Sequence, residues 1–89
     1  MIMAQEEIKA KLRAYVLTNH LKGEQESNLK NDTPLRTSGI IDSVGTIELV
    51  AFVENTFGIE LEAHETGVSH FDRIDDLSAL ISQKLAARS

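Results

Sequence analysis

The pair of residues best placed to do chemistry in this sequence is Asp42-Ser43. It stands where a polar segment gives way to the most regular helical pattern of the chain. A serine at the start of a helix can accept hydrogen bonds from the first backbone N–H groups and so cap the helix. The same hydroxyl can instead be presented to another protein for covalent modification. No neighbour in the sequence is placed to activate it, so a modifying enzyme would have to supply the base.

Other residue types that support catalysis or metal binding are too scattered to form a site. The three histidines lack the i, i+4 spacing of a zinc-binding pair on a helix, the chain has no cysteine, and we expect surface positions for all three. Asp72, Asp75 and Asp76 lack the spacing, the glycine and the final glutamate of a calcium loop. A chain of 89 residues also offers little room for a substrate pocket. We therefore expect no metal site and no enzymatic activity from this chain alone.

The composition is that of one small folded domain, which we assign to residues 1–89. Hydrophobic residues make up 42% of the chain, whereas aromatic residues are scarce, which argues against base-stacking surfaces. Residues 42–76 carry nine acids against one arginine, a bias that disfavours nucleic acid and would steer basic protein partners. No long apolar run marks a signal peptide or membrane span. We expect a monomeric cytoplasmic protein.

Helical periodicity accounts for most of the chain. Apolar residues from Ile8 to Val16 share one face of a first helix at about 4–19. A long loop over 20–42 follows, and its predicted anchors are Leu29, Leu35, Ile40 and Ile41. The second helix should run from Ser43 to Phe57, with Gly58 as its stop signal. A short helical turn within 62–68 precedes the last helix, at whose start the acids 72, 75 and 76 gather.

The pattern predicts an all-α bundle of three to four helices with a long loop between the first two. No strand pattern stands out in the sequence. The predicted core consists of Leu12, Tyr15, Val16, Leu49, Val53, Phe57, Phe71, Ile74, Leu77, Leu80 and Ile81.

The second helix carries two apolar stripes instead of one. Leu49, Val50, Val53 and Phe57 lie on one side, whereas Val44, Ile47 and Ala51 lie nearly opposite, at 100° per residue. A small domain can bury only one of these stripes in its own core. The second would form an exposed docking strip, whose members and acidic rim we expect to be Val44, Ile47, Glu48, Ala51 and Glu54. A fully buried central helix is the alternative, and the charge of Glu48 within the second stripe disfavours it.

The segment from Gly39 to Val44, Gly-Ile-Ile-Asp-Ser-Val, resembles the phosphopantetheine attachment motif of acyl carrier proteins, where Asp-Ser-Leu or Asp-Ser-Met is usual. The resemblance continues through Thr46-Ile47-Glu48-Leu49-Val50, Glu54 and Phe57-Gly58-Ile59, and reaches Phe71, Ile74 and Leu77. It covers nearly the whole chain beyond residue 30.

This resemblance implies that a phosphopantetheinyl transferase attaches 4′-phosphopantetheine from coenzyme A to Ser43, beside Asp42. The chain would then carry acyl or aminoacyl groups as thioesters and receive them from a loading ligase or synthase. The missing cysteine agrees with this, since the cofactor brings the thiol. A phosphodiester at the start of the helix would also meet unpaired backbone N–H groups and the positive end of the helix dipole.

Two departures leave the cargo open. Gly45 stands where carriers of fatty-acid synthesis usually show an acid, and Gly-Thr followed by an aliphatic residue, Glu and Leu is similar to D-alanyl and other stand-alone aminoacyl carriers. Glycine also weakens a helix by about 1 kcal/mol relative to alanine, and here it would remove a charge from the docking rim. The loop from Leu21 to Asn31 is richer in Lys and Asn than a housekeeping carrier would show. Outside the carrier family, the rival interpretation is a helical protein-interaction module without a prosthetic group.

Overall fold

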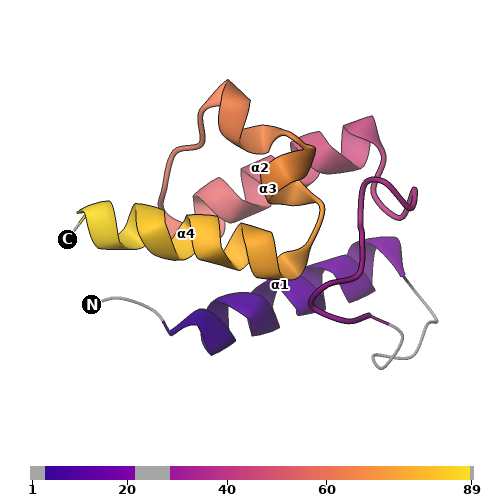
Figure 1. Ribbon diagram of the computed structural model, residues 1–89, viewed down its shortest axis with the longest axis horizontal. Coiled ribbons are helices and arrows are strands. Elements are labelled where there is room, and N and C mark those ends of the chain that lie inside the picture. Colours follow the sequence, from indigo (N-terminus) through magenta and orange to yellow (C-terminus); the bar gives the residue numbers. More distant parts are fainter. Residues whose placement is uncertain (1–3, 22–28, 89) are drawn as a thin grey trace.

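The computed structural model describes residues 4–21 and 29–88, which form a bundle of helices (Figure 1). In chain order these are α1 (Gln5–His20), α2 (Ser43–Phe57), the 3₁₀ turn η2 (Ala63–Thr66), α3 (Val68–Phe71) and α4 (Ile74–Arg88). No strand occurs in these two ranges, so the predicted all-α bundle with a long connection between the first two helices is confirmed. No helix of the described chain is long and apolar enough to cross a bilayer.

The core lies where α1, α2 and α4 meet, with α3 covering one end (Figure 1). α1 buries Ile8, Leu12 and Val16 against α4, which runs beside it. The other core residues are those expected from the sequence: Leu49, Val53, Phe57, Phe71, Ile74, Leu77, Leu80 and Ile81. The prediction was wrong for Tyr15, which is only half-buried and stacks on Phe52 with ring centroids 4.2 Å apart. Tyr15 is one of the half-buried residues that pack against the core from its edge.

The connection between α1 and α2 is held down by apolar anchors and by one aspartate. Leu29, Leu35 and Ile41 are buried as predicted, and Ile40 is half-buried. Residues 22–28, where the sequence places the polar part of the loop, lie outside the described residues.

Asp72 fastens this connection to the start of α4. Its buried carboxylate accepts hydrogen bonds from the backbone N–H groups of Arg36 and Thr37, at 2.8 and 2.9 Å, and from the Thr37 hydroxyl. Its backbone carbonyl accepts from the N–H of Leu35. The sequence assigned Asp72 to the helix dipole, an interpretation that fits Asp75 and Asp76 in the first turn of α4. Asp72 instead binds the donors of a segment 35 residues earlier in the chain.

Candidate functional site

Asp42, and not Ser43, is the N-cap of α2. One oxygen of its carboxylate, Oδ1, accepts a hydrogen bond of 2.7 Å from the backbone N–H of Gly45. Its carbonyl oxygen accepts both the N–H and the hydroxyl of Thr46, each at 2.8 Å. The extended backbone at Asp42 (φ −88°, ψ −170°) is the conformation that a cap residue requires. The capping role that the sequence allowed for Ser43 is therefore taken by its neighbour.

Ser43 is the first helical residue of α2 and its side chain is exposed. Its hydroxyl makes no hydrogen bond to any residue within 4–21 or 29–88. The backbone N–H groups of Ser43 and Val44 likewise have no acceptor in this part of the chain, because the cap serves Gly45 and Thr46. The helix thus presents an unused hydroxyl beside two unused N–H donors at its positive end.

Gly45 is buried, so it does not belong to the exposed docking strip. A Cβ at this position would come within 2.9 Å of His20 Cε1 and within 3.1 Å of Ile41 Cγ2. The prediction that Gly45 leaves a gap in an acidic docking rim is therefore wrong. Glycine at this position lets the His20 ring at the end of α1 pack against the first turn of α2, and a larger residue would require that ring to move.

His20 is the residue that fills this space. It is half-buried, and its Nε2 atom is buried without a hydrogen-bond partner among the described residues. Its ring and that of Tyr15 form a T-shaped contact, with the centroids 5.9 Å apart. The sequence placed His20 on the surface, yet it follows Val16 by four residues and so continues the stripe of Ile8 and Leu12. That continuation was the available signal.

The exposed strip predicted on α2 is present. Val44 is 65% and Ile47 70% exposed, and they are the large hydrophobic residues that the described chain leaves exposed. Ala51 and Glu48 are exposed beside them. The alternative of a fully buried α2 is therefore wrong.

Glu54 differs from its expected role on the rim. It is half-buried, and its Oε2 accepts a hydrogen bond of 2.9 Å from the backbone N–H of Leu61. Its carboxylate therefore holds the segment that follows Gly58, whose N–H in turn closes α2 on the carbonyl of Glu54 at 2.9 Å. Gly58 has the left-handed backbone (φ 67°) of a helix C-terminal stop, as predicted.

Glu48 lies toward α1. Burial raises the pKa of Tyr15, and the negative charge of Glu48 raises it further. Phe52, which the sequence did not assign to either stripe, lies between the two faces of α2 and stacks on Tyr15. Its position between the stripes gave no periodic signal that could have found it.

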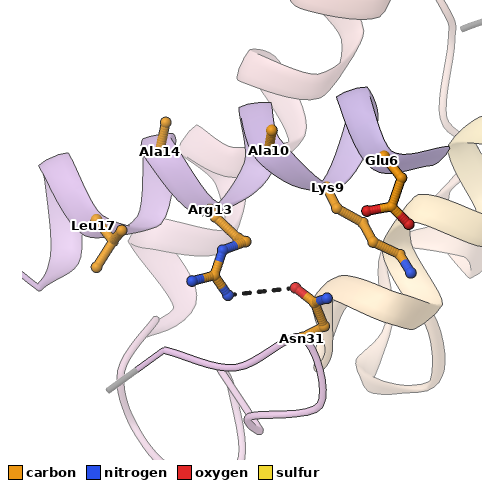
Figure 2. A pocket seen from close by; sticks show the side chains of 7 residues that line it. All are labelled: Glu6, Lys9, Ala10, Arg13, Ala14, Leu17 and Asn31. Carbon is orange, nitrogen blue, oxygen red and sulfur yellow. Dashed lines mark hydrogen bonds between the residues drawn. The ribbon is translucent and has the colours of Figure 1, made fainter. Parts of the chain in front are cut away.

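A groove of about 400 Å³ lies along α1, but Ser43 does not line it (Figure 2). Arg13 extends from α1 across this groove toward the loop, where it donates to the Leu29 carbonyl and to Asn31 Oδ1. Lys9 forms an ion pair of 3.1 Å with Asp75 of α4. These side chains hold the loop and α4 against α1, so the residues that line the groove have a structural role. No group of three or more potential metal ligands occurs among the described residues.

No family model and no curated protein matches this chain. Among solved structures, it is similar to a chain of one described as "Crystal structure of FAD-dependent dehydrogenase". The two sequences are 31% identical, the TM-score is 0.70, and the match covers 79% of this chain and 97% of the other. With this identity over nearly the whole of its relative, the chain belongs to the same family as that chain.

Proposed function

We propose that this protein is a carrier that holds acyl or aminoacyl groups on a 4′-phosphopantetheine arm attached to Ser43. The observation that carries the proposal is that Asp42, and not Ser43, caps the start of α2. Asp42 caps the helix, so Ser43 is left exposed with a hydroxyl that the described fold does not use. When bound, the arm supplies the thiol that this cysteine-free chain lacks.

The residues around Ser43 fit the phosphate end of such an arm. The N–H groups of Ser43 and Val44 have no acceptor in the described chain, and both lie at the positive end of the α2 dipole. The exposed Ser43 side chain leaves room for a transferase to approach. Asp42 keeps the first turn of α2 formed, so the hydroxyl is offered from a fixed position.

The partners we propose are a phosphopantetheinyl transferase, a loading ligase or synthase and, from the structural likeness, a FAD-dependent dehydrogenase. The match spans about 70 residues of this chain and nearly all of the other, which is therefore only about 72 residues long. A doubly wound dinucleotide-binding sheet requires two βαβαβ halves, and one βαβ unit alone takes about 30 residues. We infer that the matched chain accompanies the flavin-binding part and that a carrier could offer its cargo to such an enzyme.

The direct test is covalent modification. We expect the protein, co-expressed with a broad-specificity phosphopantetheinyl transferase, to gain one phosphopantetheine by intact-mass spectrometry, with fragment ions assigning it to Ser43. Ser43→Ala should gain none, whereas Ser38→Ala, at an exposed serine of the loop, should be modified like the parent. Parent protein that stays unmodified in the presence of active transferase would overturn the proposal.

The rival from another class is a helical interaction module without a prosthetic group, for example a piece of a dehydrogenase. The same structural likeness favours this rival as much as it favours a docked carrier. Incubation of the purified protein with active transferase and coenzyme A separates the two. The carrier proposal predicts phosphopantetheine on Ser43, whereas a protein that stays unmodified would support the rival.

A further inference from the structure

We infer that Glu54 binds the positively charged amino group of the cargo, so that the cargo held on Ser43 is an aminoacyl group and not a plain acyl group. This inference rests on the proposed carrier function and narrows the cargo to one chemical class. It also gives Glu54 a second role besides its bond to the segment that follows α2.

Ser43 and Glu54 lie on the same side of α2. They are 11 positions apart, and at about 100° per residue this separates them by only about 20° around the helix axis. Ile47 and Val50 lie between them at helical spacing, the first exposed and the second half-buried. This side of the helix therefore presents, in order, a hydroxyl, two aliphatic side chains and a carboxylate.

The distance along the helix matches the length of the arm. At a rise of about 1.5 Å per residue, Glu54 follows Ser43 by about 16 Å along the axis. The arm has about 14 bonds between the serine oxygen and its sulfur, and an extended chain advances about 1.2 Å per bond, so the arm reaches about 17 Å. The thioester carbonyl and the α-carbon of an aminoacyl group add to this reach. The amino group can therefore meet Glu54 without a fully stretched arm.

The carboxylate of Glu54 is able to accept such a group. Its Oε2 accepts the N–H of Leu61 at 2.9 Å, whereas Oε1 has no partner in the described chain. One neutral N–H leaves the negative charge in place, and no cation whose side chain the structure describes pairs with it. The bond to Leu61 orients the carboxylate, and its half-buried position reduces screening by water. An ammonium would complete a charge-assisted hydrogen bond there.

The other carboxylates close to this side of α2 do not fit the end of the arm. Asp42 directly precedes Ser43, so an extended arm leads away from it. Glu48 lies about 140° from Ser43 around the axis, toward α1. A plain acyl group would bring no charge to Glu54 and would gain no ion pair from it.

The test compares two cargoes that differ by a single amino group, alanyl and propionyl. Active transferase attaches each from a coenzyme A analogue in which NH replaces the terminal sulfur, so that the cargo stays bound, and intact mass confirms the loading of Ser43. Nuclear magnetic resonance then follows the Leu61 amide. We expect this resonance to shift with alanyl and to keep its cargo-free position with propionyl, because the Leu61 N–H shares the carboxylate of Glu54.

A charge-removing variant provides the second readout. Glu54→Gln keeps an oxygen for the Leu61 N–H but loses the negative charge, and circular dichroism melts should show that it folds like the parent. We expect the acid dissociation constant of the alanyl amino group to be about threefold smaller in the parent than in Glu54→Gln, as for an ion pair at a partly exposed site. Glu48→Gln, on another side of α2, should leave this constant at its parent value.

Each contrary result has a distinct meaning. Equal Leu61 shifts for the two cargoes, or equal dissociation constants in the parent and Glu54→Gln, overturn the inference and leave the carrier function standing, because Ser43 is loaded. A larger effect of Glu48→Gln than of Glu54→Gln assigns the amino group to another carboxylate and also overturns the inference. Absence of loading on Ser43 in the parent overturns the carrier function and the inference together.

Discussion

Two aspartates near the starts of helices, Asp42 and Asp72, both accept hydrogen bonds from backbone N–H groups, but they serve different purposes. Asp42 is exposed and its carboxylate accepts one N–H from its own helix, which frees the next residue for work outside the protein. Asp72 is buried and accepts donors from a distant loop, which joins α4 to the connection between α1 and α2. Asp42 supports the candidate site by capping its own helix, whereas Asp72 supports the fold by binding a distant loop. Substitutions of these two aspartates should therefore separate effects on function from effects on stability.

The largest loss of stability is expected for Asp72→Ala. The substitution leaves the N–H groups of the half-buried Arg36 and the exposed Thr37, and the Thr37 hydroxyl, without their acceptor, at a cost of about 1–3 kcal/mol. Urea unfolding followed by circular dichroism measures this cost. Glu60→Ala, at an exposed carboxylate, serves as the control and should change stability by less than about 0.5 kcal/mol. Equal stabilities for the two variants would show that Asp72 does not fasten the loop.

Protonation of Asp72 at low pH should cause part of the same loss in the free energy of unfolding. Burial raises the pKa of Asp72, but hydrogen bonds from Thr37 and Arg36 lower it more, so its pKa lies below the ordinary value. Because the unfolded chain then takes up the proton first, the contribution of Asp72 is complete above about pH 4 and is lost as the pH falls further through the folded pKa. We expect urea midpoints to fall less steeply below about pH 4 for Asp72→Asn than for the parent. Parallel curves would contradict this linkage.

The next effect concerns Gly45. Helix propensity alone predicts that Gly45→Ala stabilises the protein by about 1 kcal/mol, but the added Cβ would collide with His20 and Ile41. Overpacking of this kind costs about 1–3 kcal/mol, so we expect a net loss of about 1 kcal/mol. A double-mutant cycle with His20→Ala should recover at least about 0.5 kcal/mol of it. A Gly45→Ala variant more stable than the parent would mean that the two helices separate easily at this contact.

Gly45 also marks the limit of what the sequence could tell. Periodicity within each helix predicted α1, α2, α4, the buried stripe and the exposed strip, because a 3.6-residue repeat depends only on neighbours along the chain. Periodicity could not predict contacts between segments that are far apart in the sequence. The loop bound by Asp72 and the ring of His20 against Gly45 depend on how distant segments meet, and the bond from Leu61 N–H to Glu54 depends on how the chain turns after α2. At the candidate site, periodicity predicted the exposed strip, but whether Ser43 caps the helix depended on the bond from Gly45 N–H to Asp42.

A smaller change in stability, about 1 kcal/mol, is expected for Asp42→Ala, which removes the acceptor for Gly45 N–H. The first turn of α2 should then fray, and modification of Ser43 should slow although the serine remains. Hydrogen exchange at the amides of Gly45 and Thr46, compared with those of α4, measures the fraying. Unchanged exchange at these two amides would show that the first turn does not depend on Asp42.

The smallest effect on stability belongs to the residue with the largest proposed role. Ser43→Ala removes a hydroxyl that makes no hydrogen bond within the described chain and places a better helix former at the first position of α2. We expect the free energy of unfolding to stay within about 0.5 kcal/mol of the parent, while attachment of phosphopantetheine is lost completely. If Ser43→Ala were instead as destabilising as Asp42→Ala, Ser43 would share in capping the helix, and the separation between a cap at 42 and a free hydroxyl at 43 would fail.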